Sequence, residues 1–148
     1  MDELQADSGQ WNGVNDFDET DWLVNAGPED TASASWFRPV YSASRKMGAG
    51  FDALCTAVVT QQYAADAQFC SDLRLTWLGS QSGTKSGAGL IRAEVRVYWL
   101  REGMTGLSDS IPTSVCALTS QEMDDPANQQ LFHMIHLSTA LREHLGNE

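Results

Sequence analysis

The sequence predicts an α+β domain built on an antiparallel sheet of about four strands, with a short helix near its N-terminus. Three stretches lead to this prediction. Residues 90–100 alternate strictly, with apolar side chains at odd positions and charged ones at several even positions, which is typical of a half-buried strand. Residues 70–78 alternate in the same way, and residues 131–145 carry a third apolar run.

A loop rich in glycine and serine, residues 79–89, joins the first two stretches. Two alternating strands connected in this way favour an antiparallel hairpin. We expect their apolar residues to share one buried face and the polar residues between them to meet water. The apolar residues of that face are Leu73, Leu75, Trp77, Val95, Val97 and Trp99.

Three further segments are expected to be extended. Residues 36–41 contain Pro39, and the residue before a proline avoids the helical region. A β-branched run favours a strand over roughly residues 54–62. Residues 115–118 form a short apolar run that we interpret as an edge strand.

Residues 131–145 fit two different structures. Asp125 can cap a helix, Pro126 would occupy its first position, and Gly146 would end it. The same residues also alternate, with apolar side chains in both sets, as in a strand that is buried on both faces. The local pattern leaves both alternatives open.

The chain of 148 residues is long enough for one domain with a hydrophobic core, and it carries a net charge of −11. This charge argues against nucleic-acid binding and against binding to an anionic membrane surface, since both need a basic face. Nine of the 20 acids lie in residues 1–30, which contain no Lys or Arg. We therefore divide the chain into an acidic N-terminal segment, residues 1–35, and a globular domain, residues 36–148.

The acidic segment also carries large apolar side chains. It is too hydrophobic for a simple disordered tail, so we expect it to pack onto the domain or onto a partner. Residues 1–10 favour a short helix within it. The large aromatic residues here and just beyond are candidate partner contacts. They are Trp11, Phe17, Trp22 and Trp36.

Asp16, Asp18 and Asp21 place oxygen ligands at close intervals, as calcium sites do. The glycine and glutamate that complete an EF-hand loop do not follow them. These residues are therefore a weak calcium candidate, and a solvated acidic loop is the favoured interpretation. No other metal and no cofactor is predicted.

His133 and His136 would share a face on a helix and could then bind a metal. No nearby side chain completes such a site, so two unrelated histidines are favoured. Asp124 and Asp125 are interpreted as caps or solvated acids. No nucleophile motif is present, and the sequence predicts a non-enzyme. A metal-dependent enzyme using the two histidines and the acids of residues 16–21 is a less favoured class.

The three cysteines are Cys55, Cys70 and Cys116, and none belongs to a CxxC or metal-binding pattern. An odd number permits at most one internal disulfide and leaves one thiol over. Three buried or free thiols and a single disulfide both remain open.

Three segments together resemble the globular part of a type IV pilin-like protein, specifically a minor pilin of the pilus-priming type. Residues 92–103 are similar to the family's central strand, which ends in an aromatic residue, a charge and a turn. Residues 70–77 are similar to the preceding strand. Residues 132–143 resemble the closing strand, in which an apolar run leads into a Thr-X-X-Arg ending. The resemblance covers about residues 68–143.

The resemblance implies a non-enzymatic subunit that helps to initiate or cap a type IV pilus or a secretion pseudopilus. Its partners would be other pilin-like subunits in a tip or priming complex. The family's long apolar helix, which anchors subunits in the inner membrane before assembly, is missing from this sequence. Residues 1–11 would be the tail of that helix, and residues 12–35 its connection to the sheet.

The same resemblance implies an extracytoplasmic location, in the periplasm or at the cell surface. It favours a disulfide between Cys55 and Cys70 or between Cys70 and Cys116, and it favours the strand for residues 131–143. The alternative is a cytoplasmic binding or adaptor module that acts through protein–protein contact by its acidic segment. The chain opens without a basic or apolar targeting region, which fits a cytosolic protein or one whose targeting segment was removed.

Overall fold

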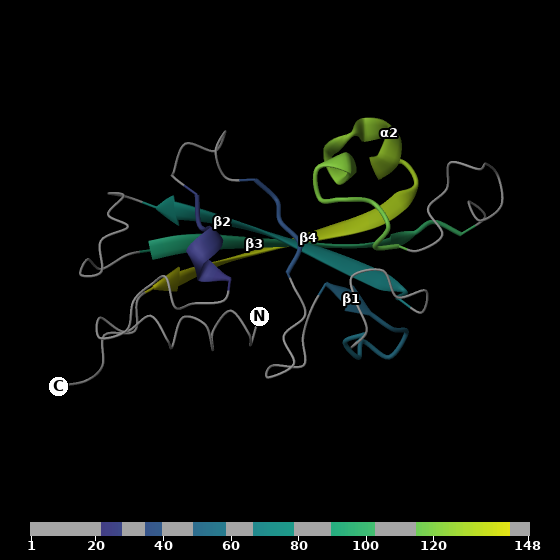
Figure 1. Cartoon of the computed structure of the whole chain (residues 1–148), viewed down its shortest axis with the longest axis horizontal. Helices are drawn as coiled ribbons and strands as arrows, with labels where there is room; N and C mark the ends of the chain where they lie inside the picture. The colour runs from purple at the N-terminus through teal and green to yellow at the C-terminus, as the bar shows by residue number, and fades with distance from the viewer. Residues whose placement is uncertain are drawn as a thin grey trace. The chain divides into compact units, whose positions relative to one another are not determined.

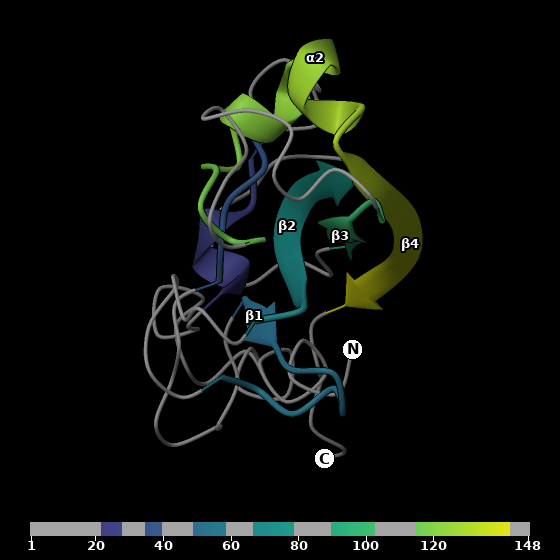
Figure 2. The ribbon, with the colours of Figure 1, turned by 90° about the vertical axis from the view of Figure 1, so that its right-hand side faces the viewer.

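The computed structural model describes residues 22–27, 35–39, 49–58, 67–78, 90–102 and 115–142. Its central element is a four-stranded sheet in the order β1-β2-β3-β4 (Figure 1). The strands are Gly50–Phe51 (β1), Phe69–Leu78 (β2), Leu90–Leu100 (β3) and Phe132–Arg142 (β4). Figure 2 shows β2, β3 and β4 side by side.

Helix is scarce in the described residues. It amounts to one α-helical turn, Pro126–Gln129 (α2), and two 3-10 turns, Leu23–Asn25 (η2) and Glu122–Asp124 (η3). The antiparallel sheet is as predicted, but the described part is more β-rich than the α+β class that we expected. The helix predicted over residues 1–10 lies outside the described residues. None of the helices that the structure describes is long and apolar enough to cross a membrane.

β2 and β3 are neighbours in the sheet, as the predicted hairpin requires. Side-chain contacts fix their alignment. Asp72 pairs with Arg96, and Arg74 pairs with Glu94. Each step of two residues along β2 matches a step of two back along β3, which is the pattern of directly opposed residues in an antiparallel pair.

The buried face of the hairpin differs from the prediction. Ile91 and Ala93 are buried at odd positions of β3, but further along the strand Arg96 and Tyr98 are buried at even positions. Val95, Val97 and Trp99 are only half-buried. On β2, Leu73, Leu75 and Trp77 are buried as expected, yet Asp72 and Thr76 on the opposite face are buried too. The expectation that the polar residues of both strands meet water is therefore wrong for Asp72, Thr76 and Arg96.

Short segments cover the free side of β2. Phe37 exchanges two backbone hydrogen bonds of 2.8 Å with Leu73, and Ala49 accepts another from Ser71 at 2.8 Å. β1 then pairs antiparallel with the start of β2. Gly27 covers a further part of the strand through a parallel bridge to Thr76. The extended structure predicted for residues 36–41 is thus seen at Phe37, while residues 40 and 41 lie outside the described part.

The chain divides into two compact units, and each has its own buried residues. The first comprises residues 1–35, 74–94 and 138–148, and the second residues 36–73 and 95–137. Residues 1–35 are therefore grouped with segments of the sheet. In the first unit the described interior includes Leu23 and Ile91. In the second, a cluster of buried residues surrounds a disulfide. That cluster is Ala49, Ala67, Cys70, Tyr98, Val115, Cys116, Met123 and Phe132.

The strand predicted for residues 131–143 is present as β4. The local helix signals are also real, but they act over one turn only. The Asp125 carboxylate accepts a hydrogen bond from the Ala127 N–H at 2.8 Å, and Pro126 occupies the first position of α2. The helix ends at Gln129, and the apolar run that follows pairs into the sheet, where it buries Phe132.

Two predicted strands are not found in the residues that the structure describes. Asp52 begins a turn, in which its carboxylate accepts hydrogen bonds from the N–H groups of Leu54 and Thr56 at 2.8 Å each. A side chain that satisfies the backbone locally competes with a strand ladder. Residues 53–54 therefore form a turn, residues 55–56 have no regular structure, and a single bridge follows at Ala57. Residues 59–62 lie outside the described part.

Residues 115–118 are the second correction, because they form a turn and a bend and are not an edge strand. Val115 and Cys116 are buried there in the cluster of the second unit. The apolar run was therefore a correct sign of burial. The carbonyl groups of Cys116 and Leu118 accept hydrogen bonds from the Arg38 side chain.

Candidate functional site

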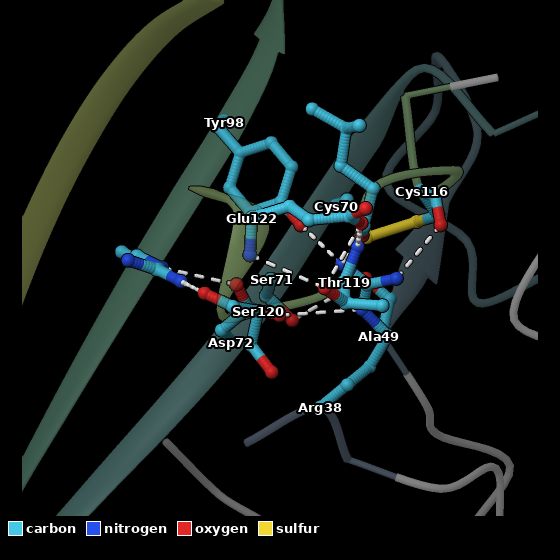
Figure 3. A network of polar contacts seen from close by, with 12 residues as sticks. Arg38, Ala49, Cys70, Ser71, Asp72, Tyr98, Cys116, Thr119, Ser120 and Glu122 are labelled. Carbon is cyan, nitrogen blue, oxygen red and sulfur yellow. Dashed lines mark hydrogen bonds and ion pairs between the residues drawn. A yellow bond between two sulfur atoms is a disulfide. The ribbon is translucent and has the colours of Figure 1, made fainter. Parts of the chain in front are cut away.

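The second unit contains a buried network of charges centred on Asp72 (Figure 3). Asp72 lies in the middle of β2 and is completely buried. One carboxylate oxygen accepts from Arg38 Nε at 3.2 Å and the other from Arg96 Nε at 3.0 Å. The single negative charge of Asp72 is thus shared between two positively charged guanidinium groups. Charges withdrawn from water are tolerated only when they are paired in this way.

The two arginines bind the carbonyl groups of residues 116–120. Arg38 donates to the carbonyl oxygens of Cys116 at 2.7 Å and Leu118 at 2.6 Å. Arg96 donates to the carbonyl oxygen of Ser120. Every second carbonyl of this stretch therefore faces a guanidinium group. We call residues 115–131 the cap segment, because they are fastened to the sheet through these contacts.

Arg96 is held by two further groups. Its Nη1 donates to the Asp124 carboxylate at 2.5 Å. The ring of Trp36 lies 4.5 Å from the guanidinium carbon, within the range of a cation–π contact. Trp36 also meets the ring of His136 edge-on, with centroids 5.9 Å apart.

Tyr98 closes the network on β3. Its hydroxyl accepts a hydrogen bond of 2.6 Å from Arg38 Nη2, and its ring packs edge-on against Phe132 at 5.5 Å. Burial, followed by the charge of Asp72, raises the pKa of Tyr98 well above its ordinary value. The phenol therefore stays neutral and acts as a hydrogen-bonding group in the core.

Local capping shapes the outer part of the cap segment. Thr119 and Glu122 form a capping box, in which the Glu122 carboxylate accepts from the Thr119 N–H at 2.7 Å and the Thr119 hydroxyl accepts from the Glu122 N–H at 3.2 Å. These bonds to the backbone and hydroxyl of Thr119 lower the pKa of Glu122. Asn128 and Gln129 reach back to the carbonyls of Glu122 and Met123 at 2.8 and 3.0 Å, so η3 and α2 support each other.

A disulfide joins Cys70 on β2 to Cys116 at the start of the cap segment. Of the two pairings that the resemblance favours, the structure therefore has Cys70–Cys116. The bridge spans a sequence separation of 46 residues and is buried. Closing a loop of this length stabilises the fold by about 4 kcal/mol in the chain-entropy account. Cys55 is an exposed free thiol, and a buried disulfide of this kind is typical of oxidising compartments.

The network acts by holding side chains and backbone groups in position. The Nε, Nη1 and Nη2 atoms of Arg38 and Arg96 all donate to acceptors within the protein, so neither guanidinium is directed at a ligand. One sign of the network was visible in the sequence, because Asp72 and Arg96 are opposite charges at even positions of the two predicted strands. We expected both side chains to meet water and so missed it.

Of the predicted contact residues, Trp22 and Trp36 lie in the described part of the chain. Trp22 is buried, with 7% exposure, and Trp36 is half-buried against Arg96. Trp11 and Phe17 lie outside the described residues, as do the calcium candidates Asp16, Asp18 and Asp21. Among the residues that the structure describes, no group of three or more histidine, cysteine or acidic side chains could hold a metal ion.

The histidine pair is separated by the strand geometry. Residues three apart on a strand point to opposite faces, so His133 and His136 are not brought together. His133 lies beside the Trp99 ring, with centroids 5.5 Å apart, whereas His136 lies beside Trp36. A metal site built from this pair is therefore excluded by β4 being a strand.

β4 also presents exposed apolar side chains. Ile135 is 48% exposed and Leu137 49% exposed. On the same face of the second unit, the Trp99 ring lies between Phe69, with centroids 5.9 Å apart, and His133. The alternation predicts that Val95, Val97 and Trp99 are buried on this face, so the exposure of the neighbouring β4 side chains was not predicted.

Comparison of the chain with protein-family models, curated proteins and solved structures gives no match.

Proposed function

We propose that this chain is a non-enzymatic assembly subunit, similar to a minor pilin, that works outside the cytoplasm by contact with other subunits. The observation that supports the proposal most is β4. Residues 132–142 carry the Thr-X-X-Arg ending that resembles the family's closing strand, and they close the sheet although a helix cap precedes them. A strand at residues 131–143 is what the resemblance leads one to expect.

The buried disulfide supports the extracytoplasmic part of the proposal. Disulfides form and persist in oxidising compartments and are rare in the cytosol. Cys70–Cys116 lies in the interior between β2 and the cap segment. The disulfide holds the cap segment to β2, and Arg38 and Arg96 hold the same segment. In a reducing compartment the disulfide would be lost and this part of the fold would be less stable.

The test is to inactivate the gene in the cells that produce the protein. We expect fewer surface fibres by electron microscopy, or loss of secretion where the fibre is a pseudopilus. Restoring the gene should restore the fibres. The coding sequence should also extend upstream through an apolar helix of roughly 20 residues. Unchanged fibres and secretion, together with a coding sequence without such a helix, would overturn the proposal.

The alternative is an acidic binding module of the cytoplasm, which the charge of residues 1–30 favours. Counting thiols in unreduced protein from its own cells separates the two. An extracytoplasmic subunit should show one reactive thiol per unfolded chain, that of Cys55, and a cytoplasmic module should show three. Isolation in the presence of a thiol-blocking reagent prevents oxidation during handling.

A further inference from the structure

Within the described residues, no strand pairs with the outer edge of β4 over residues 132–137. Backbone groups alternate in direction along a strand of an antiparallel sheet. The Leu131 carbonyl accepts from the Arg101 N–H at the end of β3, at 3.0 Å, so the odd residues of β4 bond toward β3. The N–H and C=O groups of Met134 and His136 therefore point away from the sheet. Within the described part of the chain, β4 is an edge strand and these groups have no backbone partner.

Among the residues that the structure describes, this edge carries none of the usual features that protect an edge strand. Natural proteins guard exposed edges with proline, lysine, inward-pointing charges, bulges or a covering segment. Residues 132–137 read Phe-His-Met-Ile-His-Leu and contain no proline, lysine or carboxylate. The opposite side of the sheet is covered by Phe37, Ala49 and β1. The open edge is thus not a general property of this sheet.

One face beside the edge is suited to apolar neighbours. The rings of Phe69, Trp99 and His133 form a row that crosses β2, β3 and β4. Ile135 and Leu137 continue this face along β4, and about half of each side chain is exposed. A strand added at the edge would place every second side chain next to these residues. Apolar or aromatic residues at alternate positions would fit them.

One charge at the start of the edge, that of Arg101, favours a carboxylate at the matching position of a bound segment. Among the described arginines, Arg38, Arg74, Arg92 and Arg96 each pair with a carboxylate. Arg101 is exposed and lies at the edge, because its Nε donates to the Phe132 carbonyl at 2.9 Å. No carboxylate of the described residues pairs with it. A second copy of this chain is a poor occupant, since two chains of net charge −11 repel each other.

We propose that the edge of β4 at residues 132–137 binds an extended segment of a partner protein by strand addition. The segment carries apolar side chains at alternate positions and a carboxylate near Arg101. Backbone hydrogen bonds supply affinity, and the apolar row and Arg101 supply specificity. The inference goes beyond the proposed function, because the edge would bind a segment of this type in any partner protein. Under the proposed function, that protein is another subunit of the assembly.

The probe is a short synthetic peptide that alternates valine and threonine and carries a glutamate near one end. Binding to the full, disulfide-intact chain is measured by titration calorimetry and by amide hydrogen exchange. We expect the outward amides of Met134 and His136 to become protected. The amides of His133 and Ile135 face β3 in this register and should change little. Absence of binding, or protection elsewhere but not at Met134 and His136, overturns the proposal.

Substitutions at the edge separate backbone from side-chain effects. His136→Pro removes an outward N–H that the sheet does not use and should weaken peptide binding about tenfold or more, the value of one or two hydrogen bonds. His136→Ala keeps the amide and is the matched control, with affinity near that of the unchanged chain. Circular dichroism and thermal unfolding verify that both variants fold. Equal affinity of the two variants contradicts strand addition.

Arg101 tests the charge component. Arg101→Gln should weaken the glutamate peptide about two- to fivefold, as expected for an exposed ion pair, and Arg101→Lys should weaken it less. A peptide with lysine in place of glutamate should lose the preference for Arg101. The same loss of affinity with both peptides contradicts a role for its charge. Because these measurements use only the purified chain, peptide binding with unchanged fibres would overturn the proposed function and leave the edge inference standing.

Discussion

Two ion pairs cross from β2 to β3, and they differ in environment more than in geometry. Asp72 and Arg96 approach to 3.0 Å, and Arg74 and Glu94 make two hydrogen bonds of 2.9 Å each. Both are directly opposed pairs of the same hairpin. In the first pair, the side chains are 0% and 2% exposed, and in the second they are 30% and 21% exposed.

The difference shows that the donor–acceptor distance alone does not determine how much an ion pair matters for stability. An exposed pair gains little, because water already solvates both charges and the side chains lose entropy. A buried pair gains little over an apolar replacement, but loss of one partner leaves a buried charge without compensation. Asp72 should therefore be far less tolerant of substitution than Glu94, although Arg74–Glu94 has the more complete geometry.

The largest effect is expected for Asp72→Ala. One substitution removes the carboxylate from both Arg38 and Arg96, so the loss should approach about 5 kcal/mol, the upper end for breaking a buried pair. Urea unfolding of the disulfide-intact protein, followed by tryptophan fluorescence, measures it. The double substitution Arg96→Met with Asp72→Leu should recover part of the loss. A loss below about 1 kcal/mol for Asp72→Ala would contradict the buried-pair argument.

Removing the disulfide should come next. Cys70→Ala together with Cys116→Ala is expected to cost about 4 kcal/mol, mainly through the freedom gained by the unfolded chain. Cys55→Ser is the control and should leave the unfolding midpoint nearly unchanged, since that thiol is exposed. The disulfide and Asp72 hold the same cap segment, so their combined cost should differ from the sum. Strict additivity would show that they act independently.

The partly exposed pair, Arg74–Glu94, should have a small effect on stability. Glu94→Gln is expected to change the free energy of unfolding by no more than about 1 kcal/mol at low salt. The change should shrink as salt is added, because solvent screens partly exposed charges. Unfolding curves at low and high salt measure both quantities. A cost as large as that of Asp72→Ala would remove the contrast between the two pairs.

The smallest effect concerns Glu122, which is exposed. The capping box lowers its pKa in the folded protein, so its contribution to stability is fully present above its ordinary pKa and is lost as the pH falls through the lowered value. Glu122→Gln should therefore be less stable than the unchanged chain at neutral pH and equal to it in strong acid. Thermal unfolding across this pH range tests the sign. A difference that grows toward low pH would contradict the capping role.

The hairpin was predictable because the alternation in β2 and β3 is a local property of the sequence. β4 was predictable only with the family resemblance, since Asp125 and Pro126 signal a helix that ends after one turn. The network was missed because alternation assigns Asp72 and Arg96 to water. Their burial depends on residues 115–131, which are distant in sequence and cover that face. No local pattern shows that Arg38 reaches the carbonyls of Cys116 and Leu118.

The alternate carbonyls held by Arg38 and Arg96 also affect which cysteines form the disulfide. They fix the backbone on both sides of Leu118 and so hold Cys116 close to Cys70. Two thiols kept together in this way meet at a high effective concentration. Exchange among three cysteines should therefore converge on one product, with Cys55 left reduced. Oxidative refolding of a chain with Arg38→Met should instead give a mixture that includes bridges to Cys55, which peptide mapping would reveal.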